Sequence, residues 1–252
     1  MYLILNKIKF IEYLNFYNYL KIHFFDGKQM YLLATIVILS YLIGSIPTSI
    51  IVSKAVKGID IRDHGSGNAG GTNVMRVLGW KHGLLVILLD AFKGVLAVVV
   101  VARLHYGSMP FQNATPFDDF TLVQIIAGIS AVIGHIWTVF AGFKGGKGIA
   151  TALGVLLMVV TVDMLVAIGV FVLVVSISRF VSLGSILGAL AVPITLIIRE
   201  NVFNVDIQGY NTLLPFVIFL ALLVIFTHRK NVVRLLNGNE NKVSFKKKTK
   251  SS

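Results

Sequence analysis

Long apolar runs constrain this chain more than any other feature. A helix that crosses a bilayer needs about 20 predominantly apolar residues, and several stretches reach that length with only small polar interruptions. Hydrophobic residues make up 56% of the 252 residues and charged residues only 13%, whereas about a quarter of the residues of a soluble domain are charged. We therefore predict an all-α integral membrane protein whose helices form one domain.

One carboxylate decides how the spans are counted. Asp163 interrupts the apolar run 148–178, and a carboxylate at the centre of a bilayer costs about 2.5–3.5 kcal/mol. We therefore place Asp163 at a turn and predict a short helix on each side of it, which makes seven transmembrane helices. The predicted spans are 31–53, 83–102, 122–143, 149–162, 164–178, 181–198 and 212–227.

The basic residues orient these spans. The formal net charge is +12, and Lys and Arg gather after the first, third and fifth predicted spans and in the tail. Cations in alternate intervals indicate the cytoplasmic side, so the N-terminus is predicted outside and the C-terminus in the cytoplasm. This distribution favours a multi-pass protein of the cell (inner or plasma) membrane in contact with lipid, and it makes nucleic acid a poor explanation for the charge.

The two ends of the chain differ from the apolar body. In residues 1–29, apolar side chains recur at helical spacing among several lysines, which predicts an interfacial amphipathic helix. The alternative is that translation begins at Met30. We therefore divide the chain into an atypical extension (1–29), a membrane domain (30–241) and a basic cytoplasmic tail (242–252).

Two glycine-rich, polar stretches lie between the apolar runs, and the first covers residues 65–73. It matches G-x-G-x-x-G, but that pattern indicates dinucleotide binding only between a strand and a helix, so we reject that interpretation. Glycine backbone N–H groups, side-chain donors and an Arg fork can bind phosphate. Close packing of small residues is the alternative. The candidate residues are Ser66, Asn68, Gly70, Thr72, Asn73 and Arg76.

The second stretch covers residues 142–148. It is not a nucleotide-binding P-loop, because Gly148 rather than Ser or Thr follows Lys147. Lys147 nevertheless lies at the start of a predicted helix, where an ammonium and a helix N-terminus both attract an anion. Gly145 and Gly146 are included in this candidate site.

Further polar residues border the predicted spans. His135 ends one span, and it is either a hydrogen-bonded structural residue or a catalyst. His228 and Asn231 share a helix face at i, i+3 and form either part of a site or an interfacial cluster. Asp90 and Lys93 are expected to pair with each other, while Ser182 and Ser185 could add hydroxyl donors on the cytoplasmic side.

Some chemistry is excluded by what is missing. No His is followed five residues later by Asp, so the activating pair of the acyl-CoA-dependent glycerolipid acyltransferases is lacking. The cytoplasmic intervals hold no aspartate cluster for Mg²⁺, and no Cys/His set indicates zinc. We therefore predict no metal and no cofactor.

Three ordered motifs resemble the bacterial acyl-phosphate:glycerol-3-phosphate acyltransferases, integral membrane enzymes of phospholipid synthesis. The first combines residues 44–49 with 65–76, the second runs from 134 to 151, and the third from 228 to 240. The chain departs from the family pattern at Trp137-Thr138, where the family usually has an aromatic residue followed by Pro, and at Ala69 and Gly71.

The resemblance implies transfer of an acyl chain from acyl phosphate to the 1-hydroxyl of sn-glycerol 3-phosphate, giving lysophosphatidic acid and phosphate. It also implies functional coupling to an enzyme that makes acyl phosphate. Lys147, Arg76 and Ser66 would stabilise the transition state, with no protein base, because a substrate phosphate takes the hydroxyl proton. A small organophosphate or anion transporter is the alternative function. By the resemblance, the polar pocket would be formed by Ser66, Thr72, Arg76, Lys147, Ser185, His228 and Asn231.

Overall fold

The computed structural model describes residues 27–242, and within that range every regular element is a helix. Three short 3₁₀ helices (η1, Ile61–Asp63; η2, Val101–Leu104; η3, Val139–Ala141) connect longer ones. The amphipathic helix predicted for the first 29 residues and the basic tail lie largely outside the described residues. The α-helices are α2 (Gly27–Gly44), α3 (Thr48–Lys57), α4 (Gly71–Leu78), α5 (Trp80–Val99), α6 (Asp119–Ile136), α7 (Ile149–Val159), α8 (Thr161–Ser178), α9 (Val181–Asn201), α10 (Tyr210–Thr227) and α11 (Arg229–Leu236).

Six segments of the described chain are long and apolar enough to cross a membrane. The predicted seventh, α7, is apolar but has only 11 residues, so the count of seven and the orientation stay predictions. The first predicted span, 31–53, is not continuous: α2 ends at Gly44 and α3 begins after Pro47. Proline cannot donate a helical hydrogen bond and disfavours helical backbone at the preceding residue, so the break follows from the sequence.

The break between α7 and α8 comes at Val160 rather than at Asp163, which corrects the predicted position of the turn. Asp163 lies in the first turn of α8 and is buried. It accepts a hydrogen bond from Arg199 of α9 at 2.7 Å. A carboxylate is favoured at a helix N-terminus, and the guanidinium balances its charge, so Asp163 can remain inside the helix.

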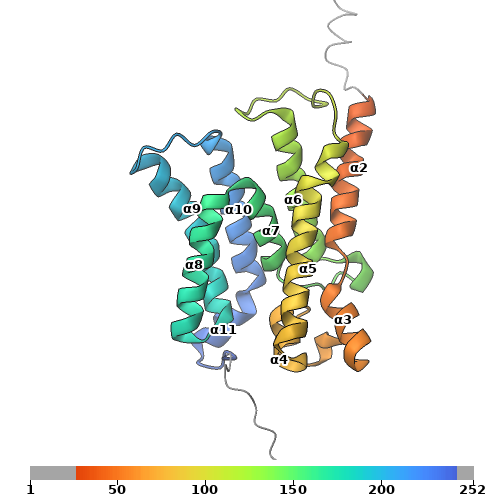
Figure 1. Ribbon diagram of the computed structural model, residues 1–252, viewed down its shortest axis with the longest axis vertical. Helices are drawn as coiled ribbons and strands as arrows, with labels where there is room; N and C mark the ends of the chain where they lie inside the picture. Colours follow the sequence, from red (N-terminus) through yellow and green to blue (C-terminus); the bar gives the residue numbers. More distant parts are fainter. Residues whose placement is uncertain (1–26, 243–252) are drawn as a thin grey trace, which may run out of the picture.

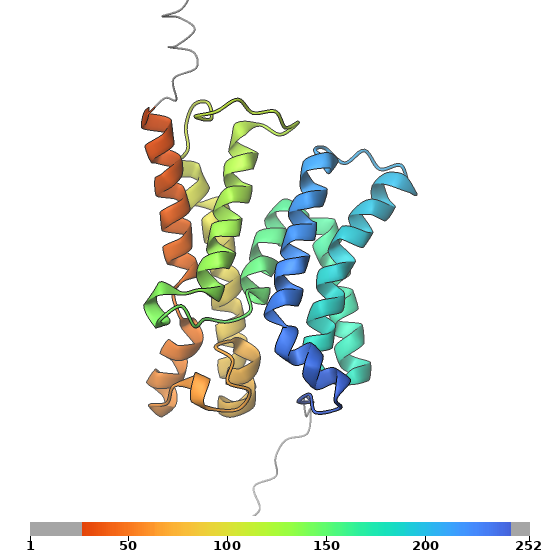
Figure 2. The ribbon, with the colours of Figure 1, turned by 180° about the vertical axis from the view of Figure 1, so that it is seen from behind.

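The helices form two groups with α7 between them (Figures 1 and 2). One group contains α2, α5 and α6, the other α8, α9 and α10, and α7 packs chiefly against α5. That contact is close because it is lined by glycine: a Cβ on Gly94 would collide with the Thr151 carbonyl, and one on Gly154 with the Ala91 carbonyl. Small residues let membrane helices approach in this way.

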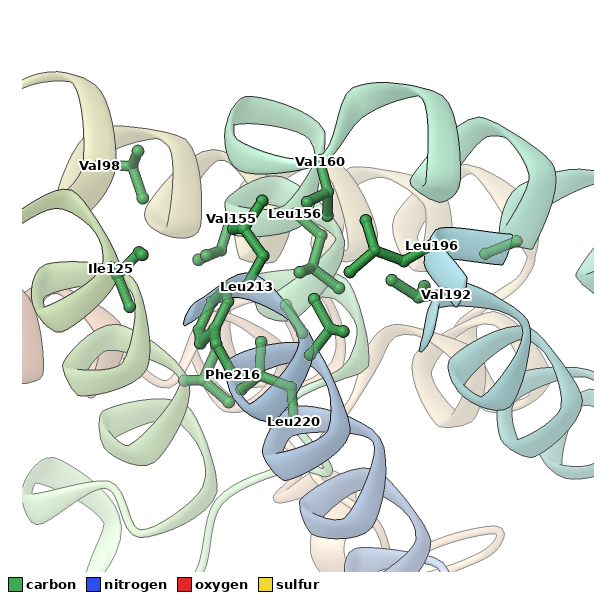
Figure 3. Close-up of a cluster of buried hydrophobic side chains, with 14 of the residues drawn as sticks. Val98, Ile125, Val155, Leu156, Val160, Val192, Leu196, Leu213, Phe216 and Leu220 are labelled. Atoms are coloured by element: carbon green, nitrogen blue, oxygen red, sulfur yellow. The ribbon is translucent and has the colours of Figure 1, made fainter. Parts of the chain in front are cut away.

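The largest buried apolar cluster surrounds α7 (Figure 3). Val155 and Leu156 of α7 belong to this cluster together with Val98 of α5, Val192 of α9 and Phe216 of α10. The short helices α3, α4 and α11 all lie at the same end of the bundle, where the described chain ends at residue 242 (Figure 1). The short α-helices are therefore concentrated at one end of an apolar bundle, while the loops 105–118 and 202–209 lie at the other end (Figure 1).

Candidate active site

A cavity of about 390 Å³ lies between the two groups of helices. Its wall is drawn from both glycine-rich stretches and from every α-helix from α4 to α11. One part of the wall is polar, and the other is formed by apolar side chains of spanning helices. The predicted site residues on the wall are Ser66, Asn68, Gly70, Thr72, Asn73, Arg76, His135, Lys147, Ser182, Ser185, His228 and Asn231.

The first glycine-rich stretch is held in shape by one buried amide. Asn73 Nδ2 donates to the carbonyls of Ile61, His64 and Asn68 at 2.9–3.1 Å, and its Oδ1 accepts from the Ser66 backbone N–H at 2.8 Å. A buried amide engaged in this way fixes the loop that carries Ser66 and Asn68. The direct contact predicted between Asn73 and substrate stays a prediction.

The helix that follows this loop presents its N-terminus and a guanidinium to the cavity. Gly70 precedes α4 and offers no side-chain cap. The Asn73 N–H donates to the Gly70 carbonyl at 3.0 Å, which leaves the N–H groups of Gly71 and Thr72 available to an anion. Thr72 and Arg76 line the cavity one turn apart. Burial lowers the pKa of Arg76, but a guanidinium remains charged in proteins. This segment therefore supplies a permanent cation beside backbone donors.

In the second glycine-rich stretch, some residues line the cavity and others bond to the end of α6. The N–H groups of Gly145 and Gly146 each donate at 3.1 Å to the carbonyls of Ile136 and His135, at the end of α6. The cavity wall includes Lys147 and the following Gly148, but not these two glycines. The structure thus places Gly145 and Gly146 behind the wall, because their amides close the preceding helix.

Lys147 is tied to the third motif by a chain of hydrogen bonds. Its Nζ donates to Asn231 Oδ1, Asn231 Nδ2 donates to Glu240 Oε1 at 2.8 Å, and Arg234 Nε donates to Glu240 Oε2 at 2.8 Å. Burial lowers the pKa of Lys147 to about 8, although Glu240 counteracts part of that shift. Glu240 also lines the cavity and was not among the predicted site residues, although its position in the third motif could have indicated it.

His228 adds a neutral ring. It is buried, and burial together with the nearby Lys147 cation lowers its pKa to about 4. Its Nδ1 lies 2.8 Å from the Val224 carbonyl oxygen, so Nδ1 carries the proton and donates it to that oxygen. At neutral pH the other nitrogen, Nε2, can then only accept a hydrogen bond.

The apolar part of the wall comes from three consecutive helices, and sequence reasoning did not predict it. Ala167 of α8 and Gly188 of α9 both line this part, and their small size lets the two helices approach closely, since a Cβ on Gly188 would lie 3.2 Å from the Ala167 carbonyl oxygen. A ligand that filled both parts would have an anionic head and a hydrocarbon chain. The main apolar residues are Leu153, Leu156, Met164, Ala167, Ile168, Phe171, Gly188, Ala189 and Val192.

The predicted pair of Asp90 and Lys93 is confirmed, with 2.7 Å between Lys93 Nζ and Asp90 Oδ1. Asp90 and His135 both reach the cavity wall, which was not predicted for Asp90. Across residues 27–242, no three His, Cys, Asp or Glu side chains gather as a metal site would require.

Known proteins are similar to this chain in sequence and in fold. A family model described as glycerol-3-phosphate acyltransferase matches residues 34–238. The glycerol-3-phosphate acyltransferase of Chlorobaculum tepidum is 48% identical over 228 residues, covering 84% of this chain and 97% of the relative. That of Chlorobium chlorochromatii is 47% identical over 235 residues, covering 86% of this chain and 100% of the relative.

Two crystal structures of the integral membrane glycerol 3-phosphate acyltransferase PlsY (YgiH) are also similar. The glycerol 3-phosphate form has a TM-score of 0.70 and 36% identity, and the lysophosphatidic acid form has a TM-score of 0.68 and 35% identity. Each match covers 86% of this chain and 96% of the solved chain.

Proposed function

Because the chain belongs to the glycerol-3-phosphate acyltransferase family, we propose that it transfers an acyl chain from acyl phosphate to the 1-hydroxyl of sn-glycerol 3-phosphate. The products are lysophosphatidic acid and phosphate, and the step is the first acylation of phospholipid synthesis. Family membership sets aside the transporter alternative.

The observation that carries the proposal is the division of one cavity into a cationic and an apolar part. Both substrates have phosphate groups, and Arg76 and Lys147 line the cationic part with Ser66. The acyl chain matches the apolar part between α7, α8 and α9. A lone phosphate site would not need the apolar wall, and a site for an uncharged lipid would not need the cations.

The reaction requires little of the protein beyond positioning the two substrates and stabilising the charge that develops. Acyl phosphate is a mixed anhydride with a good leaving group, so holding the hydroxyl near the carbonyl carbon supplies much of the rate. As the carbon–oxygen bond to phosphate breaks, negative charge grows on the leaving oxygens. Lys147 and Arg76 stabilise that charge, and Ser66 donates a hydrogen bond. We expect a phosphate of the substrates, rather than a protein base, to accept the hydroxyl proton.

The test is a donor comparison with purified protein. Acyl phosphate should support turnover with glycerol 3-phosphate, while acyl-CoA and acyl carrier protein loaded with an acyl chain should not. Excess EDTA should leave the rate unchanged, since the proposed chemistry uses no metal. Robust turnover with acyl-CoA alone, without acyl phosphate forming, would reject the donor assignment, and loss of activity that Mg²⁺ restores would reject the metal-free mechanism.

We further propose that the chain lies in the cell membrane with the C-terminal end of the bundle in the cytoplasm, where a soluble enzyme could supply acyl phosphate. The chain contains no cysteine, so single cysteines can report the orientation. In intact cells an impermeant thiol reagent should label Asp206→Cys, between α9 and α10, but not Asn239→Cys, after α11. The reverse labelling pattern would overturn the orientation.

A further inference from the structure

A cluster of buried polar side chains lies next to the cavity within the spanning helices. Lys93 and Asp90 are 4% and 1% exposed. Besides its contact with Asp90 at 2.7 Å, Lys93 Nζ donates to the carbonyls of Gly44 at 3.1 Å and Ile46 at 2.8 Å. These three oxygens account for the three hydrogens of the ammonium. Lys93 therefore fastens α5 to the break between α2 and α3.

Asp90 extends the cluster to two more elements. Its Oδ1 accepts a hydrogen bond from the Thr48 hydroxyl, at the start of α3. His135 Nδ1, near the end of α6, lies 3.5 Å from the same oxygen and 3.3 Å from Lys93 Nζ. His135 Nδ1 therefore contacts both members of the ion pair, within hydrogen-bond distance of the Lys93 ammonium and next to the Asp90 carboxylate. One ion pair thus connects α2, α3, α5 and α6.

His135 carries this connection to the loop of Lys147. Its backbone carbonyl accepts from the Gly146 N–H at 3.1 Å. Its ring lies so close to Gly146 that a Cβ there would collide with Nε2. The residue immediately before Lys147 is therefore held by both the main chain and the side chain of His135.

A buried ion pair is weak evidence for stability, because apolar replacements of similar volume are often neutral or stabilising. Charged groups within the membrane more often mark a functional site. We propose that Lys93 and Asp90 are positioning residues for acyl transfer: they fix His135, and through it the loop that holds Lys147 at the cavity. This inference rests on the proposed function, since the reaction defines what Lys147 must be aligned with.

The chain contains a matched control. Asp163 and Arg199 form another ion pair, also at 2.7 Å, with Asp163 buried in a spanning helix. That pair joins α8 to α9, and neither residue lines the cavity. It shares the chemistry of the Lys93–Asp90 pair but has no connection to the Lys147 loop.

The experiment replaces each pair with apolar residues of similar size: Lys93→Met with Asp90→Leu, and Asp163→Leu with Arg199→Met. We expect both double variants to fold. The first should lose at least tenfold in kcat with a smaller change in KM for glycerol 3-phosphate, because the transition state tolerates less misplacement than binding does. The control should keep its kcat. A folded Lys93→Met/Asp90→Leu protein with wild-type kcat would overturn the proposal.

Coupling to Lys147 separates positioning from general destabilisation. Residues that act through one another give non-additive effects, so Lys147→Ala should reduce kcat by a smaller factor in the Lys93→Met/Asp90→Leu background than in the control background. Equal factors would contradict a role exerted through Lys147. If the Lys93→Met/Asp90→Leu protein does not fold, Asp90→Asn takes its place. A folded Asp90→Asn protein with wild-type kcat would then overturn the proposal.

Hydrogen–deuterium exchange of the peptide that contains Gly145–Lys147 gives a readout without turnover. Exchange should be faster in the Lys93→Met/Asp90→Leu protein, or in its Asp90→Asn substitute, and unchanged in the control pair. Unchanged exchange in both the Lys93/Asp90 variant and the Asp163/Arg199 control would contradict the inference. Because this measurement needs no substrate, it distinguishes failure of the positioning role from failure of the proposed function, which would appear as a wild-type protein inactive with acyl phosphate.

Discussion

The two parts of the cavity are built in different ways. The polar part joins side chains that are far apart in sequence, such as Arg76, Lys147 and Glu240. Hydrogen bonds between side chains hold part of this set in place. The apolar part is lined by consecutive helices, with small residues such as Ala167 and Ala189 facing the space. Hydrogen bonds fix direction, whereas apolar contact is non-directional. The head of a ligand is therefore held in one place, while its tail has more freedom.

This difference predicts two kinds of variant. A change in the polar part should alter turnover by the same factor for every acyl chain, because the reacting groups are common to all donors. A change in the apolar part should alter the dependence on chain length and leave the affinity for glycerol 3-phosphate unchanged. Variants that mix the two effects would contradict the division.

The largest effect is expected from Lys147→Ala. The ammonium is expected to stabilise charge on the leaving phosphate, so its removal should lower kcat by about 10²–10³, as removal of one oxyanion-hole donor does. Steady-state kinetics with short and long acyl phosphates should give the same factor. Lys144→Ala is the matched control, because Lys144 belongs to the same loop but is exposed and absent from the cavity wall.

A well-folded Lys147→Ala protein with near wild-type kcat/KM would show that the loop is only a packing turn. Thermal stability in detergent must be measured beside activity, since Lys147 also contacts Asn231. A factor that changed with acyl chain length would show that Lys147 acts on the tail as well as on the head.

The polar part could be predicted from the sequence because its residues are unusual in their surroundings. Glycine, Asn, Arg and Lys differ from the apolar runs on either side of them, so Arg76, Lys147 and Asn231 could be predicted as site residues without a structure. Ala167 and Ala189 could not be, since on sequence alone they resemble any residue of a spanning helix. Their role depends on which helices face each other across the space, a property of the tertiary structure.

Two further features depend on contacts between helices. The sequence lacks the local His–Asp spacing, yet the fold brings His135 of α6 within 3.5 Å of Asp90 of α5. Asp163 indicated a helix break, but its pairing with Arg199 allows it to stay inside α8. In both cases the sequence identified the unusual residue, while its partner lay on another helix.

A smaller effect is expected from pH. Burial lowers the pKa of Lys147 to about 8, so the free enzyme carries the ammonium below that pH and loses it above. Raising the pH from 7 to 9 should therefore lower kcat/KM by about tenfold, the change in the charged fraction across that pKa. Bound phosphate favours the charged form, so kcat should fall less.

The control for this pH dependence is Lys147→Arg. A guanidinium does not titrate in this range, so the variant should have a lower rate but a flat profile between pH 7 and 9. The alkaline fall should have the same shape for every donor, because it belongs to the polar part of the cavity. An unchanged alkaline fall in Lys147→Arg would assign the titration to another group.

The smallest and most selective effect is expected in the apolar part. Ala189 lines the cavity from α9, and Ala189→Leu fills space that the acyl chain would occupy. Each methylene displaced from an apolar site loses about 0.8 kcal/mol, or about fourfold in kcat/KM. Saturated acyl phosphates of increasing length should therefore lose activity only beyond the chain length that reaches residue 189, while KM for glycerol 3-phosphate stays the same.

Leu187→Phe is the matched control, because Leu187 is exposed on the same helix and is absent from the cavity wall. It adds volume outside the cavity and should leave the chain-length profile unchanged. If Ala189→Leu instead lowered activity equally for all donors, the added side chain would be disturbing the head of the ligand. The apolar part would then be continuous with the reacting groups, and head and tail could not be tuned separately.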